Sequence, residues 1–399
     1  MCDDRAVRTL DISTARRWSM LAIALASTMF ANVFVNGAAF LIPTLHTRHG
    51  LHLAQAGLMS AMPSIGMVVT LIAWGYVVDR VGERIVLALG SALSAAAAFA
   101  AAAANSLPLI GVFLLLGGMA AASSNSASGR LVVGWFPARQ RGLVMGIRQT
   151  AQPLGVGLGA LVIPRLAESH GVGAALLFPA LVCAASAVVS AVGVIDPPRP
   201  AREQAAADEL TNPYRGSGLL WRIHAVSVLL VVPQVVVWTF TLVWLIADRG
   251  WSAAAAGALV TAAQVLGALG RVAAGRWSDR VGSRLRPIRS IAAGAALAMA
   301  LLGLTDALHS PLSIVVMIAA SVITVSDNGL AFTAIAEIAG PFWSGRALGT
   351  QNTSQLLTAG IAPALFGGLI SAVGYPWAFG ACALFPLVAL PLVPVRANT

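Results

Sequence analysis

Charged side chains are rare inside the long apolar stretches of this sequence, and Asp327 and Arg148 lie deepest within them. An ionised group at such depth is costly unless it is paired or faces water. A carboxylate there can carry a coupling proton, and a guanidinium can bind an anion through two hydrogen bonds. Both also have structural interpretations, Asp327 as a partner for a neighbouring amide or arginine and Arg148 as a side chain that reaches back to the surface. Arg130 and Arg271 lie nearer the segment ends, where structural or gate roles are expected.

The other polar side chains that point to a site in the apolar segments are mainly amides. Several repeat every four residues, as Asn32 and Asn36 do, so that they share one face of a helix. A tryptophan such as Trp238 more often packs against its neighbours than forms a substrate platform. The predicted substrate site consists of Asn32, Asn36, Asn125, Arg148, Gln152, Gln234, Trp238, Gln264, Asn328, Gln351 and Gln355, with Asp327 as the candidate proton carrier.

No pattern for metal binding, cofactor binding or ATP use is present. His46, His49 and His52 are spaced by three residues, but no cysteine or carboxylate accompanies them, so we interpret them as solvated loop residues. The chain has no lysine and hence no phosphate-binding loop of the Gly-Lys-Ser/Thr type. We therefore expect no metal and no cofactor.

Composition places these residues in a membrane. The 399 residues are 58% hydrophobic and 10% charged, whereas a soluble domain has roughly a quarter charged residues. Apolar runs of about 20 residues, long enough to cross a bilayer as helices, recur throughout. The fold class is predicted to be all-α integral membrane, with spans near 18–44, 53–78, 84–104, 107–135, 142–165, 172–195, 221–247, 252–278, 287–308, 311–338, 345–372 and 376–395.

A polar stretch divides the spans into two groups of six. We expect an N-terminal six-helix bundle at 1–195, a cytoplasmic linker at 196–220 and a C-terminal six-helix bundle at 221–399. Arginines concentrate in the loops on one side, which predicts that both termini are cytoplasmic and explains the net charge of +10 without nucleic acid. The expected location is the plasma (inner) membrane of a bacterium.

The two halves repeat each other. Gly-Tyr-Val-Val-Asp-Arg-Val-Gly-Glu-Arg at 75–84 recurs as Gly-Arg-Trp-Ser-Asp-Arg-Val-Gly-Ser-Arg at 275–284. A shift of 203 residues places 146–152 over 349–355. Corresponding helices thus carry polar groups at corresponding depths, as in transporters whose site lies between two repeats. The shared motif residues are Gly75, Asp79, Arg80, Gly82 and Arg84, followed by Gly275, Asp279, Arg280, Gly282 and Arg284.

The motif at 75–84 resembles the loop 2–3 signature of the major facilitator superfamily (MFS), and 275–284 resembles its second copy at loop 8–9. The stretch at 139–146 is similar to the loop 4–5 of that family. The resemblance covers essentially the whole chain. It implies twelve transmembrane helices in two six-helix repeats, with helices 3, 6, 9 and 12 outside. It also implies that Asp79 contacts the start of helix 11 and that the motif residues belong to a gate.

The favoured function is secondary active transport of a small polar metabolite or organic anion by alternating access, with proton coupling through Asp327 as a hypothesis. The expected partners are a small-molecule substrate, protons and the lipid bilayer, and the chain is expected to act as a monomer. One alternative is an antiporter for drug or metabolite efflux, although the fifth span lacks a Gly-Pro pair and the first lacks an acid. An alternative of another class is a polytopic membrane enzyme or sensor that does not transport.

Overall fold

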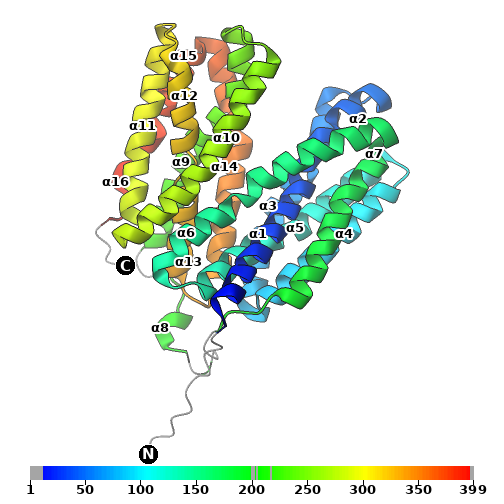
Figure 1. Cartoon of the computed structure of the whole chain (residues 1–399), viewed down its shortest axis with the longest axis vertical. Helices are drawn as coiled ribbons and strands as arrows, with labels where there is room; N and C mark the ends of the chain where they lie inside the picture. The colour runs from blue at the N-terminus through cyan, green and yellow to red at the C-terminus, as the bar shows by residue number, and fades with distance from the viewer. Residues whose placement is uncertain (1–11, 199–202, 204, 216–217, 396–399) are drawn as a thin grey trace, which may run out of the picture.

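Every regular element in the described part of the chain is a helix. The computed structural model describes residues 12–198, 203, 205–215 and 218–395. Figure 1 shows two helical bundles that stand side by side, touch at the lower end and splay apart at the upper end. The first helix begins and the last helix ends toward the lower ends of their bundles.

The helices follow the predicted order. The first bundle contains α1 (Thr14–Gly37), the 3-10 turn η1 (Ala38–Leu41), α2 (Ile42–His49), α3 (Leu53–Val81), α4 (Glu83–Ala103), α5 (Leu107–Trp135), α6 (Ala138–Gln149) and α7 (Ala151–Gly193). The short α8 (Ala207–Leu210) connects it to the second bundle. That bundle contains α9 (Leu219–Val243), the π-helical turn η2 (Trp244–Asp248), α10 (Ala253–Val281), α11 (Leu285–Ala307), α12 (Leu312–Ile323), α13 (Asn328–Ala339), α14 (Ser344–Val373), α15 (Tyr375–Cys382) and α16 (Leu384–Leu392).

The chain crosses the molecule twelve times. Among the described residues, 11 continuous helical stretches are long and apolar enough to span a membrane. One of them, 138–193, has 56 residues, about 84 Å at 1.5 Å per residue, which exceeds a hydrocarbon core of about 30 Å. Gly171 interrupts this stretch with φ 85 and ψ 176, a conformation that favours glycine. The stretch therefore forms two spans, and the prediction of twelve is confirmed.

Glycines of the two repeated motifs end α3 and α10. Gly82 has φ 99 and joins α3 to α4, and Gly282 has φ 65 and follows α10. Both values lie in the region that glycine tolerates best. We call the end of the molecule at which these two helices stop the motif end.

Two predicted elements differ from the structure. Span 311–338 is not one helix but α12 and α13, joined by a turn at 324–327. The side chains of Thr324 and Ser326 bond to carbonyls four residues back, a contact that bends helices. His46 and His49 were predicted in a loop but lie in α2, which Pro43 starts and the left-handed Gly50 ends.

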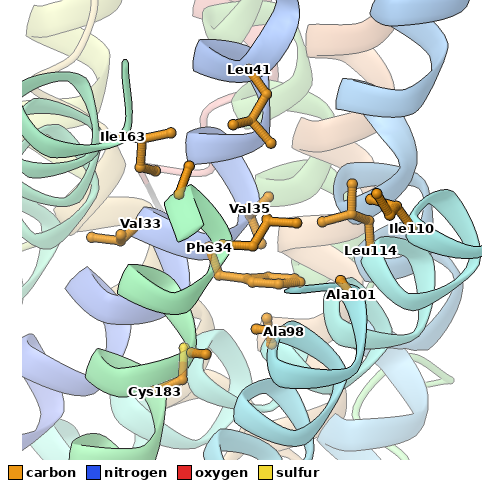
Figure 2. Packing of buried hydrophobic residues seen from close by; sticks show 14 of the residues in the cluster. Val33, Phe34, Val35, Leu41, Ala98, Ala101, Ile110, Leu114, Ile163 and Cys183 are labelled. Carbon is orange, nitrogen blue, oxygen red and sulfur yellow. The ribbon is translucent and has the colours of Figure 1, made fainter. Parts of the chain in front are cut away.

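An apolar core holds the first bundle together. Phe34 of α1 packs among Ala98, Ala101 and Leu114, as Figure 2 shows. The alanines admit the ring because they are small. On α4, Leu93 is 45% exposed, as expected for a helix that has one face against its bundle and another against lipid.

Candidate substrate cavity and gate

A polar cavity of about 130 Å³ lies between the two bundles. Nine of its lining side chains are amides, contributed by both bundles. Seven residues predicted for the substrate site lie on its wall: Asn32, Asn36, Asn125, Gln152, Gln234, Asn328 and Gln355.

Each bundle holds some of these amides in a short hydrogen-bonded chain. Asn36 Nδ2 donates to Asn32 Oδ1 at 3.0 Å on α1. Across the cavity, Asn328 Nδ2 donates to Gln234 Oε1 at 3.0 Å, and Gln355 Nε2 donates to Asn328 Oδ1 at 3.4 Å. These contacts fix the orientation of the amides and leave other donors and acceptors for a solute.

Arg271 of α10 is the one charged side chain among the described residues that line the cavity. It is 3% exposed, and its Nε has no hydrogen-bond partner within the described part of the chain. Sequence interpretation had given this arginine a structural or gate role. Its position on the cavity instead makes it available to a solute.

Arg148 does not line the cavity. Its Nε and Nη2 donate to Ser128 Oγ at 3.0 and 2.8 Å, its Nη1 donates to Gln149 Oε1 at 3.0 Å, and its Nη2 also donates to the Asn125 carbonyl at 3.2 Å. The prediction that Arg148 reaches back to the surface is wrong, since it is 1% exposed. The cause is the start of α6 at Ala138 rather than near 142, which puts Arg148 about 15 Å along the helix.

Asp327 lies in the turn between α12 and α13. It is 1% exposed and does not line the cavity. Its Oδ2 has no hydrogen-bond partner among the described residues. The turn that carries it packs on α10 at the residue before Arg271, where a Cβ on Gly270 would lie 3.0 Å from Ser326 Oγ. The charged atoms of Asp327 and Arg271 are not within the 4.0 Å of an ion pair.

The remaining predicted site residues lie elsewhere. Trp238 and Gln264 line a smaller cavity of about 20 Å³, which shares Gln234 with the main one. Gln351 is buried, and its Oε1 lies 2.7 Å from Nδ1 of His224. Because an amide oxygen can only accept, Nδ1 donates, and Nε2 accepts from the Tyr214 hydroxyl at 3.0 Å.

Two latches join the bundles at the motif end. In the first, Asp79 of α3 accepts hydrogen bonds from the backbone N–H groups of Gly345 and Arg346, at 2.8 and 3.1 Å, at the start of α14. In the second, Asp279 of α10 accepts from Gly142 and Leu143 of α6, at 2.9 and 2.8 Å. The expected contact of Asp79 with helix 11 is thus present. A carboxylate in this position also complements the positive end of a helix dipole.

Different charges support the two latches. Arg130 of α5 bridges Asp79 and Glu83 at 3.3 and 3.1 Å. On the other side, Arg284 bridges Asp279 at 2.5 Å and Glu337 of α13 at 3.2 Å. Burial lowers the pKa of Arg284, but the hydrogen bonds and charges of Glu337 and Asp279 outweigh it, so the pKa stands above its usual value.

Two motif arginines face outward. Arg80 is exposed, and its guanidinium lies 4.4 Å from the centre of the Tyr76 ring. Arg84 donates from its backbone to Asp196 at 2.7 Å and from Nε to the Ala191 carbonyl at 2.6 Å. It therefore ties the start of α4 to the end of α7.

Sequence interpretation missed several functional positions. Gln149 and Asn352 line the cavity, and a signal existed for both, because the shift of 203 residues superimposes them. Arg346 also escaped notice. It donates from Nε to Asp79 Oδ2 at 3.0 Å and stacks 3.5 Å from the Trp343 ring centre, and no repeat or spacing pointed to it.

A buried amide cavity between two six-span bundles, closed at one end by paired latches, defines a polytopic membrane transporter. The sequence matches the Major Facilitator Superfamily over residues 21–363. The chain belongs to this superfamily and is not an enzyme.

Known proteins resemble the chain over nearly its whole length. It is 60% identical to the uncharacterized MFS-type transporter Rv2994 of Mycobacterium tuberculosis over 380 residues, 95% of this chain and 85% of that protein. It is 25% identical to the gallate transporter of Pseudomonas putida, over 94% of this chain and 90% of that protein. Its fold matches the proton:xylose symporter XylE with a TM-score of 0.77 at 17% identity, covering 95% of each chain.

Proposed function

We propose that this transporter carries a small polar metabolite or organic anion by alternating access. The observation that supports the proposal is the cavity whose amides come from both bundles. A solute that bridges the bundles couples its binding to their relative movement. A volume of about 130 Å³ suits a small solute, since a cavity of about 150 Å³ holds benzene.

An organic acid is the favoured solute class. The cavity combines neutral amides with one guanidinium, Arg271, and an arginine pairs well with a carboxylate. The relative from Pseudomonas putida is named a gallate transporter, which agrees with this class.

Proton coupling through Asp327 is part of the proposal. Asp327 is buried, carries an unpartnered oxygen and lies in a turn that packs on α10 at the residue before a cavity arginine. A carboxylate in that position can gain and lose a proton as the bundles move. The proposed mode is symport of the acid with a proton.

We assign the motif end to the cytoplasm of a bacterial cell. Arginine placement supports this orientation. The latches then close the cytoplasmic side, so that the conformation described here is the one open toward the outside. A reporter fused after Gly218 is expected to signal from the cytoplasm, and a periplasmic signal contradicts the orientation.

Transport by the purified full-length protein in proteoliposomes tests the proposal. We expect a pH gradient, acid outside, to drive uptake of at least one organic acid from a labelled panel of gallate, other organic acids, sugars and amino acids. Asn328→Ala and Gln355→Ala should each reduce uptake severalfold, because they remove cavity amides. The exposed Thr261→Ala on α10 is the control. Uptake that is unaffected by both cavity substitutions contradicts the proposal.

A further inference from the structure

We propose that Arg271 binds the carboxylate of the transported solute. The inference rests on the proposed transport function and names the substrate class of the same cavity. It assigns anion recognition to α10, and not to Arg148 of α6.

The guanidinium of Arg271 has N–H donors that are available to bind a ligand. No hydrogen bond within the described part of the chain uses it, and its Nε is buried without a partner. Buried polar groups in proteins are normally satisfied, so each exception needs a reason. Arg148 is the matched contrast. It is equally buried, but its donors are taken by Ser128, Gln149 and a carbonyl.

Close packing holds Arg271 on the cavity wall. A Cβ on Gly146 of α6 would lie 2.5 Å from the Arg271 carbonyl oxygen, so only glycine lets α6 approach α10 at this level. Gly270, the residue before Arg271, and Gly267, one turn earlier, face α12 and the turn after it, where a Cβ on Gly270 would lie 2.8 Å from Val322. The backbone that carries Arg271 is thus fixed from two sides, and its planar guanidinium matches the geometry of a planar carboxylate.

The surroundings select a small monocarboxylate with further polar groups. The cavity has one positive side chain, so it offers full compensation to one negative charge. Amides such as Asn328, Gln149 and Asn352 line the same cavity and can donate to or accept from hydroxyl or carbonyl groups. A dianion would leave one charge without a partner in a buried site.

Asp327 makes the binding depend on protons. The turn that carries Asp327 packs on α10 at the residue before Arg271, since a Cβ on Gly270 would lie 3.0 Å from Ser326 Oγ. A bound carboxylate and an ionised Asp327 therefore place two negative charges near one guanidinium. Two anions beside one cation leave a buried net negative charge, which a proton on Asp327 removes. Binding of the solute as an anion therefore brings one proton into the protein.

The other charged groups on the helices around this pair have partners or face outward. Arg148 of α6 is saturated as described, and Glu337 at the far end of α13 binds Arg284 and Arg141. The contacts of the remaining groups place them away from the pair: Arg130 with Asp79 and Glu83, Arg346 with Asp79, Arg249 with Asp306 and Asp248, Arg222 with the Leu392 carbonyl, His224 with Gln351, and Arg276, Arg280, Arg286 and Arg289 at the motif end of α10 and α11.

Paired probes test the inference on the purified full-length protein in detergent. The probes are benzoate, lactate and pyruvate, each beside its uncharged amide, and the readouts are the ligand-induced shift in Tm and the Kd. We expect at least one carboxylate to bind in preference to its amide. Arg271→Gln should remove the preference and raise the Kd of that carboxylate roughly 10- to 100-fold, and Arg271→Lys should retain part of it. Arg148→Gln should lower the Tm of the protein but keep the preference.

The outcomes separate the inference from the proposed function. No preference for any carboxylate in the wild-type protein overturns the inference, as does a preference that survives in Arg271→Gln. Uptake of a neutral solute that depends on Asn328 but not on Arg271 supports the transport proposal and overturns the inference about Arg271. Carboxylate binding that requires Arg271, without uptake in proteoliposomes, supports the inference and removes the transport proposal.

Discussion

Gly75 of α3 and Gly345 of α14 lie so close that a Cβ on either would come within 2.4 Å of the other's carbonyl oxygen. Gly142 and Gly275 have the same relationship, at 2.4 and 2.1 Å. Backbone atoms cannot move aside as a flexible side chain can, so the two bundles can approach this closely at these four positions only because each residue is a glycine. Each pair lies beside one of the aspartate latches.

Alanine at these glycines should therefore open the motif end. We expect Gly75→Ala and Gly142→Ala to shift the population away from the closed state, because the added methyl overlaps backbone of the opposite bundle. Distances between spin labels on the motif ends of α3 and α14 measure the shift. Gly157→Ala on α7 is the control, since a Cβ there meets no atom within 4 Å, and it should leave the distances unchanged. Unchanged distances in Gly75→Ala contradict the expectation.

Loss of Arg130 should cost more stability than loss of Arg284. Arg130→Met leaves Asp79 and Glu83, whose side chains are 2% and 0% exposed, without this cation. Arg284→Met leaves Asp279 and Glu337, at 7% and 22% exposed, where water can solvate part of the charge. Breaking a buried pair costs about 3–5 kcal/mol, so we expect the larger drop in Tm for Arg130→Met. Equal drops would show that burial of the acids does not matter.

Asp327→Asn should abolish accumulation driven by a pH gradient. The amide cannot gain or lose a proton, so substrate binding should no longer strengthen as the pH falls. Exchange of labelled for unlabelled solute at equal pH needs no net proton movement and should persist. Uptake and exchange assays on the same proteoliposomes measure both, and unchanged pH-driven uptake would make the coupling hypothesis wrong.

The hydroxyl of Tyr214 should contribute stability that is lost at high pH. Burial raises the pKa of Tyr214, against the lowering effect of Thr350 and Arg346. As the pH rises, Tyr214 ionises first in the unfolded chain, at a pH of about 10. Its contribution to stability is therefore complete below that pH and disappears as the pH rises through the pKa of Tyr214 in the folded protein. Tyr214→Phe removes one hydrogen bond to His224 and should cost about 1 kcal/mol at neutral pH. Absorbance titration of tyrosinate and Tm against pH provide the measurements. A tyrosine that titrates at its ordinary pKa contradicts this account.

The sequence predicted the number of spans, their order and most of the cavity amides, for physical reasons. Apolar length sets the spans, and Asn328 and Gln355 stood out because amides are costly in lipid. Depth does not distinguish the two arginines, since Arg148 lies ten residues from the start of α6 and Arg271 ten residues from the end of α10; only Arg271 lines the cavity. The side of a helix on which a residue lies depends on how the helix is rotated about its axis. Counting residues from a helix start, here misplaced at 142, gives the depth of Arg148 but not this rotation. The break at 324–327 was hidden because its residues, Thr324 to Asp327, form no glycine or proline signal.

Each bundle supplies the aspartate of one latch and the backbone amides of the other. The two latches therefore run in opposite directions between the bundles, and they lie at separate places on the same interface. If one opens, the bundles can pivot about the other but cannot part. Opening the motif end then requires both latches to release together. A solute that loosens only one latch does not open a passage.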